Sequence, residues 1–192
     1  MTKKDFSTLH ADYAFFEAHT TEAQADMEGY LPFLRQRLET EAALRWLDFG
    51  CGSGNFTSLL LTSLQAPPEH LHLSLVEPDA SYRQTAQACL QRFTAHTIDA
   101  WSAMPMNTSQ PYDFALANHV LYYVPDLAAV VEQIVRSLKP TGRFITAMGG
   151  RDNTLAQIWE SSLPLLGQSL PYHTGEDLER VLAQFDYPYY KQ

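Results

Sequence analysis

Short apolar segments alternate with longer amphipathic stretches along most of the chain. Strand-like apolar runs occupy residues 43–49, 71–76, 94–98, 112–118 and 143–148. Helix-like spacing of apolar residues occurs at 22–38, 56–64, 80–93, 126–138, 153–163 and 175–185. This alternation predicts an α/β fold with a Rossmann-like, doubly wound and mostly parallel sheet.

Length and local breaks define the expected organisation. At 192 residues the chain suggests a single domain. We expect an N-terminal helical lid at 1–40, a core at 43–150 and C-terminal helices at 151–192. Pro32 predicts a kink or a break in the first helix, and residues 139–142 predict a turn before the last strand.

The first predicted strand runs into a glycine-rich bend, and a helix follows. Asp48 stands near the end of the strand, and Gly50, Gly52 and Gly54 follow at every second position. Glycines permit positive φ and leave bare backbone for a ligand, while the helix start offers unpaired N–H groups. The spacing is not Gly-x-Gly-x-x-Gly and no lysine ends it, which disfavours a dinucleotide site and a phosphate loop. The alternative is a tight turn that binds no ligand.

Candidate binding residues, most of them polar or aromatic, stand at the ends of the later strands. They are Glu77 and Pro78 (second strand), Asp99, Ala100 and Trp101 (third), Asn118 and His119 (fourth), and then Tyr122 and Tyr123. Ligands of open α/β sheets bind outside the carboxyl ends of the strands, so we expect these residues to lie near the glycine bend. The alternatives are a helix-start acid for Glu77, a loop acid for Asp99 and core packing for the two tyrosines.

Composition and charge limit the classes of ligand and partner that the chain is expected to bind. The net charge of −9 disfavours nucleic acid as a partner. Residues 48–81 and 94–134 contain no Lys or Arg, which suits a cationic ligand. No apolar run approaches the roughly 18 residues of a membrane helix, and no signal peptide is seen. Cys51 and Cys89 match no metal or redox spacing, so we expect no metal site and a cytoplasmic location, with the oligomeric state left open.

The glycine spacing after an acid, the Glu77 strand end and Leu-Lys-Pro-Thr-Gly-Arg-Phe at 138–144 resemble the class I S-adenosylmethionine (SAM) methyltransferases over residues 45–148. The resemblance implies SAM as cofactor and S-adenosylhomocysteine (SAH) as product. It places the glycine bend under the methionine part, Glu77 on the ribose hydroxyls and Asp99 near the adenine. The sheet of that family closes with a hairpin, so we expect this chain to lack the closing strands, through a curtailed sheet or a truncation. The expected cofactor contacts are Asp48, Gly50, Cys51, Gly52, Gly54, Glu77, Pro78, Tyr82, Asp99, Ala100, Trp101, Asn118 and His119.

Shorter stretches resemble the histamine N-methyltransferase-like family. They are 19–22, 75–80, 113–114, 120–126 and 172–178. The resemblance implies that Glu22 holds the amine of the substrate and that Asn118 and Tyr82 contact the cofactor. His119 replaces a substrate-contacting glutamine of that family, so the acceptor need not be histamine. The alternative for Glu22 is a helix N-cap or an acid in the first turn of a helix.

The resulting hypothesis is methyl transfer from SAM to a small molecule, with an amine nitrogen as the acceptor in the narrower resemblance. The expected catalytic residues are His119, which would accept a proton directly or through water, Glu22, which would orient the substrate, and Tyr122. The expected substrate contacts are Glu22, Phe16, His119, Tyr122 and Tyr123. Two alternatives stay open: a small-molecule O-methyltransferase and a SAM-binding module without catalysis.

Overall fold

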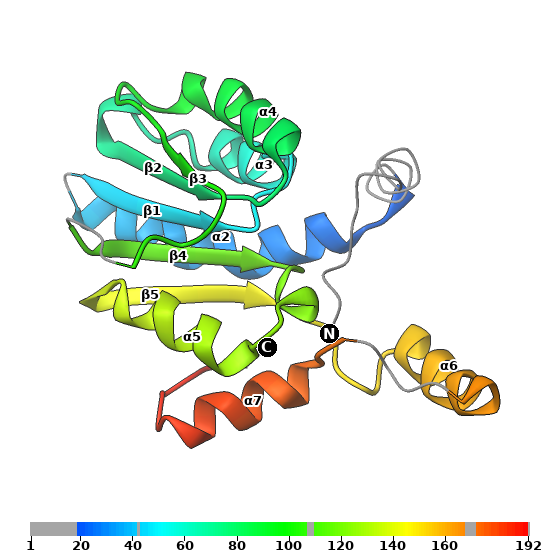
Figure 1. The fold of residues 1–192 in the computed structure, drawn as a ribbon. Coiled ribbons are helices and arrows are strands. Elements are labelled where there is room, and N and C mark those ends of the chain that lie inside the picture. Colours follow the sequence, from blue (N-terminus) through cyan, green and yellow to red (C-terminus); the bar gives the residue numbers. More distant parts are fainter. Residues whose placement is uncertain (1–18, 42, 107–109, 168–171, 192) are drawn as a thin grey trace.

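The computed structural model describes residues 19–41, 43–106, 110–167 and 172–191. Within these ranges one sheet is formed, and all its strand pairs are parallel. Its strands are β1 (Leu44–Phe49), β2 (Leu71–Val76), β3 (Asp99–Trp101), β4 (Tyr112–Asn118) and β5 (Leu138–Ala147). Their order is β3-β2-β1-β4-β5 (Figure 1). The direction of winding reverses between β1 and β4, so the carboxyl ends of these two strands mark the expected ligand crevice.

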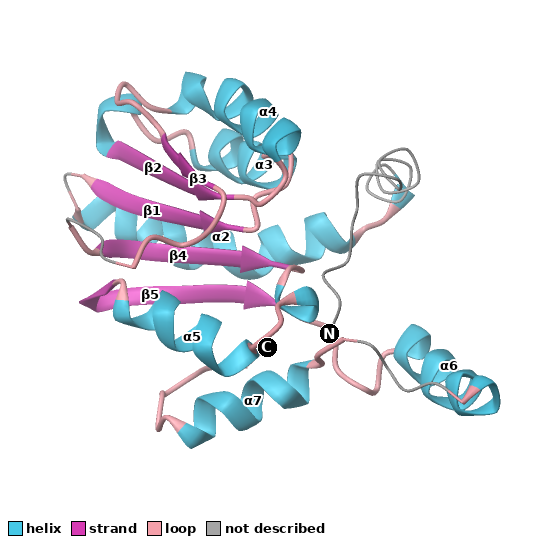
Figure 2. Ribbon diagram, viewed as in Figure 1, coloured by secondary structure: helices cyan, strands magenta, loops and turns pink. Residues whose placement is uncertain are grey.

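Helices cover both faces of the sheet, which confirms the doubly wound α/β fold (Figure 2). The described helices are α2 (Glu22–Thr40), α3 (Asn55–Leu64), α4 (Ala80–Leu90), α5 (Leu127–Arg136), α6 (Thr154–Ser162) and α7 (Gly175–Gln184), of which α6 projects away from the sheet (Figure 1). Short 3₁₀ turns are η1 (Pro68–His70), η2 (Gln91–Phe93), η3 (Leu121–Tyr123) and η4 (Leu163–Leu166). The apolar clusters place α2, α3 and α4 on one face and α5 and α7 on the other.

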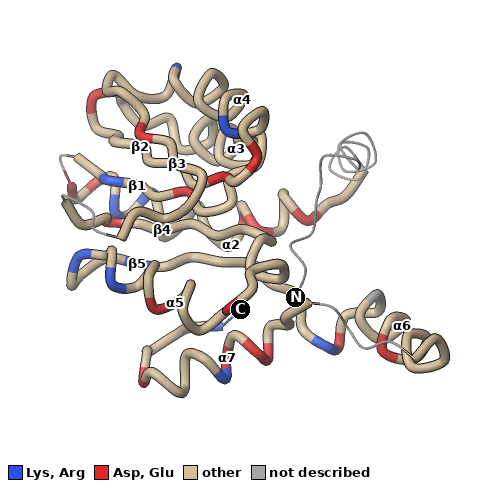
Figure 3. Tube along the Cα trace, in the orientation of Figure 1, with Lys and Arg blue, Asp and Glu red and all other residues tan. Residues whose placement is uncertain are grey.

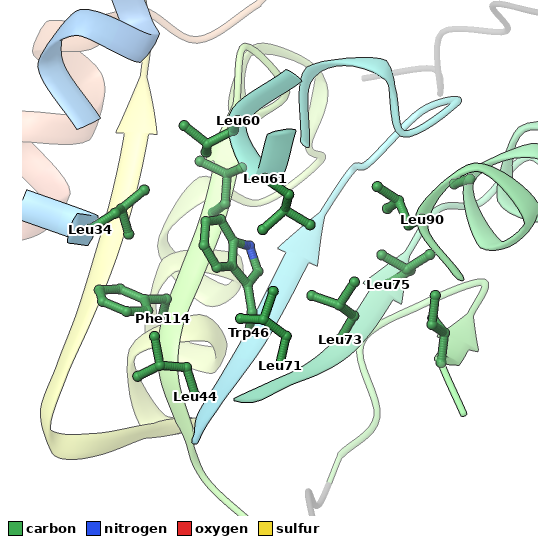
Figure 4. Packing of buried hydrophobic residues seen from close by; sticks show 13 residues of the cluster. Leu34, Leu44, Trp46, Leu60, Leu61, Leu71, Leu73, Leu75, Leu90 and Phe114 are labelled. Carbon is green, nitrogen blue, oxygen red and sulfur yellow. The ribbon is translucent and has the colours of Figure 1, made fainter. Parts of the chain in front are cut away.

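The larger core lies between the sheet and the first three helices (Figure 4). Trp46 of β1 and Phe114 of β4 are 1% exposed, and their ring centroids lie 5.8 Å apart. Leu60 and Leu61 of α3 pack into the same cluster. Burial of these side chains fixes α3 against β1, and the glycine bend that joins them is therefore held between two rigid elements.

The helix α2 follows the predicted apolar stripe but does not break at Pro32. Leu34 is buried, and Met27, Leu31 and Leu38 pack on the core, as expected from their spacing. The Phe33 ring also meets Phe114 edge-on at 5.6 Å. Packing on the sheet therefore outweighs the backbone hydrogen bond that a proline removes.

The predicted third strand at 94–98 is wrong, because the strand begins only at Asp99. The preceding residues bond irregularly to η1 and to the first residue of β2: Ala95 N–H donates to the Pro68 carbonyl, and the Thr94 hydroxyl donates to the Leu71 carbonyl. These bonds replace a strand ladder.

The turn predicted at 139–142 lies inside β5 as a bulge. Tyr112 pairs with Leu138 but Phe114 already pairs with Arg143, so extra residues of β5 loop out between the two pairs. After β5 the described residues form helices and connecting segments without a further strand. In the same ranges, no helix combines the length and apolar character needed to cross a membrane.

Candidate active site

The glycine bend joins β1 to α3 through a left-handed backbone. Gly50, Gly52 and Gly54 have φ angles of +71°, +52° and +81°. Gly50 N–H donates to the Val76 carbonyl at 2.7 Å, which ties the bend to the end of β2. Gly54 is the N-cap residue of α3, so the helix starts directly at the bend.

A side-chain carbon added at each glycine would meet different surroundings. At Gly50 it would lie 2.2 Å from Cγ2 of Val120, and at Gly54 it would lie 3.1 Å from Cα of Ala86. At Gly52 no other atom lies within 4 Å. Gly50 and Gly54 therefore allow close packing, whereas Gly52 presents bare backbone to open space, as a ligand cradle requires.

The Glu77 carboxylate lies against this bend, as the sequence predicts. Its Oε2 accepts from Gly52 N–H at 3.1 Å and its Oε1 accepts from Asp79 N–H at 2.9 Å. Pro78 follows Glu77, and Tyr82 N–H donates to the Asp79 carboxylate at 3.0 Å in the first turn of α4. Each oxygen of Glu77 keeps a lone pair for a further donor.

Asp48 is buried next to the bend, with 4% of its surface exposed. Its Oδ2 accepts the Thr57 hydroxyl at 2.6 Å. Burial raises the pKa of Asp48 to about 7, the Thr57 hydrogen bond opposes the rise, and the charge of Glu77 adds to it. Burial, followed by the charges of Asp48 and Glu77, raises the pKa of the Cys51 thiol. The charge of Glu77 contributes to both shifts, which indicates a negative potential at the bend and favours a cationic ligand.

The position of Asp99 differs from the prediction, because β3 begins at residue 99 and not at residue 94. Asp99 begins β3 opposite Ser74 and is exposed, rather than following the strand at its carboxyl end. Trp101 pairs with the last residue of β2, and its carbonyl accepts Glu77 N–H at 3.0 Å. Ala100 and Trp101 therefore lie closer to Glu77 along the strands than Asp99 does.

A second polar cluster gathers at the end of β4, and part of it comes from α2. Asn118 Nδ2 donates to Asp26 Oδ2 at 2.9 Å, and the Tyr30 hydroxyl donates to Asn118 Oδ1 at 2.8 Å. Nε2 of His119 lies 3.0 Å from the same Asp26 oxygen. Asp26 and Tyr30 are absent from the residues predicted above. Their signal was the recurrence of Glu22, Asp26 and Tyr30 every four residues, on one face of the helix.

His119 occupies a conformation that non-glycine residues rarely adopt, with φ of +52°. Such a backbone costs about 1–3 kcal/mol and persists where surrounding contacts hold it. His119 N–H donates to the Ala147 carbonyl at 3.1 Å, and Nδ1 lies 3.3 Å from the Tyr122 hydroxyl. Burial lowers the pKa of His119, but the hydrogen bond and charge of Asp26 and the charge of Glu22 outweigh burial, so the pKa is raised.

Three tyrosines form an aromatic wall beside His119. The centroids of Tyr122 and Tyr123 lie 5.7 Å apart, and Tyr172 lies 6.2 Å from the first and 6.4 Å from the second. Burial raises the pKa of Tyr122 and Tyr123, and the charge of Glu22 adds to both shifts. Glu22 is the exposed first residue of α2, and its charge reaches the tyrosine wall through these pKa shifts. Phe16, also predicted as a substrate contact, lies outside the described residues.

Two contacts join the bend to the β4 cluster. Val120, the residue that requires glycine at position 50, directly follows His119. The Tyr30 ring packs edge-on against Phe56, in the first turn of α3, at 6.1 Å. The predicted residues of the first, second and fourth strand ends therefore lie together at the point where the winding of the sheet reverses. Within the described ranges, no three or more His, Cys, Asp or Glu side chains are grouped to hold a metal ion.

Solved structures share this fold. A SAM-dependent methyltransferase from Thermotoga maritima matches with a TM-score of 0.61 and 17% identity, over 93% of this chain and 77% of that one. The N-methyltransferase NodS from Bradyrhizobium japonicum, in complex with SAH, matches with a TM-score of 0.56 and 20% identity, over 82% and 72% of the two chains. At these identities the likeness concerns the fold.

Relatives found by sequence are also named as methyltransferases. A trans-aconitate 2-methyltransferase from Methylobacterium nodulans is 31% identical over 138 residues, which cover 72% of this chain and 48% of that protein. The chain thus spans about half the length of the curated relatives that it matches. The family model of the methyltransferase domain matches residues 20–192. A match over that range, which includes the glycine bend and Glu77, makes this chain a member of the methyltransferase-domain family.

Proposed function

We propose that the protein transfers the methyl group of SAM to a small-molecule acceptor. The observation that carries this proposal is the contact between the Glu77 carboxylate and Gly52 N–H, at the glycine of the bend that faces open space. When bound, SAM supplies a methyl group that is already activated on a positively charged sulfur. The protein then mainly has to orient two reactants, which contributes about 7–11 kcal/mol in well-aligned systems.

The residues present fit the cofactor. The lone pairs that remain on Glu77 suit the two hydroxyls of a ribose, and the bare backbone of Gly52, with its positive φ, would accommodate the methionine part. We assign the adenine to the edge formed by Ala100 and Trp101, which lies beside Glu77. Asp99 supports this assignment less well, because it is exposed at the start of β3.

We further propose an amine as the acceptor. Glu22 and Asp26 of α2 place two carboxylates near His119, and tyrosine faces can hold an ammonium group. Asp48 lies near the carboxyl end of β1 and Glu77 directly follows β2, whereas Arg45 and Lys139 lie near the amino-terminal ends of β1 and β5, where Figure 3 shows basic residues. The names of two structural neighbours point the same way: NodS is an N-methyltransferase, and the Thermotoga maritima protein is named as a possible histamine N-methyltransferase.

A carboxylic acid is the second candidate acceptor, favoured by the name of the trans-aconitate relative. Arg151 and Arg180 line a cavity of about 550 Å³ that Tyr172 also borders, between α5 and α7. Both arginines already form ion pairs, Arg180 with Asp177 at 2.9 Å and Arg151 with Glu160 at 3.3 Å. An acid would have to compete with these partners, which favours the amine.

Isothermal titration with SAM and SAH tests cofactor binding. Glu77→Ala removes a charged acceptor, and a hydrogen bond of that kind is worth about 1.5–3 kcal/mol, so the affinity should fall about tenfold or more. Glu69→Ala is the matched control, since Glu69 is exposed in η1, just before β2. An unchanged affinity in Glu77→Ala would refute the assignment to ribose.

A panel of small amines, phenols and carboxylic acids, trans-aconitate included, tests the acceptor with methyl-labelled SAM. Transfer to an amine supports the first candidate, and transfer to an acid replaces it with the second. SAM binding without transfer to any compound of the panel or of a cell lysate would favour a binding module without catalysis.

A further inference from the structure

Asp26 is the centre of the hydrogen bonds that join α2 to β4. Its Oδ2 accepts from Asn118 Nδ2 at 2.9 Å and lies 3.0 Å from His119 Nε2. The side chain of Asp26 is 14% exposed and that of His119 is 26% exposed, so both groups are shielded from water. A carboxylate only accepts hydrogen bonds, and Nε2 of His119 must therefore carry the hydrogen in this contact.

The Asp26 contact selects one tautomer of neutral His119. With the hydrogen on Nε2, the other ring nitrogen carries a lone pair and accepts hydrogen bonds. This nitrogen, Nδ1, lies 3.3 Å from the Tyr122 hydroxyl. Gly149 N–H donates to the Tyr122 oxygen at 2.5 Å, so the hydroxyl hydrogen is left to point at Nδ1.

We propose that Tyr122, His119 and Asp26 form a proton relay that removes a proton from the acceptor, a proposal that rests on the methyl-transfer function above. Tyr122 is the catalytic residue that touches the acceptor, and Asp26 is a positioning residue that acts through His119. An N–H bond of the acceptor ammonium breaks, and its proton forms an O–H bond at Tyr122. The former hydroxyl proton of Tyr122 moves to Nδ1 of His119, which becomes an imidazolium beside the Asp26 carboxylate. The nitrogen keeps its electron pair for the methyl group, and the relay resets when His119 returns the proton through Tyr122 to water.

The surroundings support a coupled transfer rather than a free phenolate. Burial raises the pKa of Tyr122, and nearby carboxylates add to the rise, so the hydroxyl keeps its proton until it can pass one on. The net upward shift of the pKa of His119 makes its ring a better proton acceptor. The titratable groups around these two residues are Glu22, Asp26 and Tyr30 of α2, Tyr123 of η3, and Tyr172.

Nuclear magnetic resonance of histidine-labelled protein reads the tautomer without any acceptor. In long-range proton–nitrogen spectra we expect neutral His119 to carry its hydrogen on Nε2. In Asp26→Asn this preference should weaken and the pKa of His119 should fall, and in Tyr122→Phe the Nδ1 resonance should shift as its donor is lost. Glu28→Gln is the matched control, because Glu28 is an exposed acid of the same helix that bonds Gln24.

Kinetics with labelled SAM and the fastest amine of the panel test the catalytic role. Proton transfer by a positioned group contributes on the order of 100-fold or more, so Tyr122→Phe should lower kcat by about 100-fold while SAM affinity stays within about twofold. Asp26→Asn should lower kcat by about tenfold and move the rise of kcat with pH to lower pH, because the base becomes weaker. Asp26→Glu should restore part of the loss, and Glu28→Gln should match the wild type.

Three results would overturn the relay. They are a hydrogen on Nδ1 in the wild type, a kcat–pH profile that Asp26→Asn leaves in place, or an unchanged kcat in Tyr122→Phe. The last variant keeps the packed ring and serves if Asp26→Asn fails to fold. A wild type that binds no SAM would instead refute the proposed function, whereas a wild type that turns over normally beside an unaffected Asp26→Asn refutes only the relay.

Discussion

Replacing Gly50 and Gly52 by alanine, one at a time, separates packing from ligand binding in the bend. Both residues have positive φ, and an alanine forced into that backbone costs about 1–2 kcal/mol. At position 50 the new methyl group would also lie 2.2 Å from Cγ2 of Val120, and overpacking of this kind adds about 1–3 kcal/mol. At position 52 no heavy atom beyond the adjoining residues lies within 4 Å of the new methyl group, so only the backbone cost applies.

Gly50→Ala should therefore lose more stability than Gly52→Ala, whereas Gly52→Ala should lose more affinity for the cofactor. Gly50→Ala should lower the free energy of unfolding by about 2–5 kcal/mol, and Gly52→Ala by about 1–2 kcal/mol. For a chain of this length about 1 kcal/mol moves Tm by about 2–4 °C, so the expected losses are about 4–20 °C and about 2–8 °C. Gly52→Ala should nevertheless weaken SAH binding about tenfold, or about 1.4 kcal/mol, because its methyl group occupies the space that we assign to the cofactor.

Thermal denaturation followed by circular dichroism and isothermal titration with SAH measure both quantities. The double variant Gly50→Ala/Val120→Ala removes the clashing side chain and should recover part of the lost stability, with a coupling of about 0.5–3 kcal/mol. Unchanged SAH affinity in Gly52→Ala would place the cofactor elsewhere. Equal Tm losses in the two single variants would show that the Val120 contact carries no energetic weight.

The remaining predictions concern buried charge and a helix cap. The pKa of Asp48 is raised from 3.8 to about 7, so between these pH values the folded chain holds a proton that the unfolded chain has released. The free energy of unfolding should therefore fall by about 4 kcal/mol as the pH rises across this interval. In Asp48→Asn, urea denaturation at a series of pH values should show a flatter dependence over the same interval. The raised pKa of His119 stabilises the folded chain. This stabilisation is complete below the ordinary pKa of histidine and is lost as the pH rises through the pKa of His119 in the folded chain. Asp26→Asn should therefore cost more stability at about pH 5.5 than at about pH 9, measured in the same way. Asp126→Ala removes the acceptor of Ala129 N–H at the start of α5, and should cost about 0.5–2 kcal/mol in thermal denaturation without changing SAH affinity.

The strands that the sequence predicts well are those with continuous apolar runs. The bounds of β2 and β4 match the expected runs, because each run is buried along its length and ends at polar residues. The expected third strand fails for the opposite reason. β3 is three residues long and only partly buried, so no periodicity marks it, and its position depends on pairing with β2.

Some residues of the site can be predicted from short local motifs, whereas others depend on contacts between distant parts of the chain. The glycine bend and Glu77 are predictable because each is a short motif at the end of an apolar run, and the parallel sheet then brings the two ends together. The contacts of Asn118 and His119 with α2 span about ninety residues, and no local pattern encodes such a pairing. The structure supplies the missing step, since packing of α2 on the core decides which face of that helix meets β4.

The packing of α2 also bears on the choice of acceptor. The helix is anchored through Leu34, which is 1% exposed, so Glu22 and Asp26 are held near the end of β4. The interaction of these carboxylates with a charged acceptor changes sign between an ammonium and a carboxylate, and solvent weakens it most at the exposed Glu22. For an acid to be preferred, Arg151 or Arg180 would have to leave its present ion pair and outweigh that repulsion. If the acceptor is the amine proposed above, we expect Glu22→Gln to shift the ratio of turnover between an amine and an acid of similar size toward the acid.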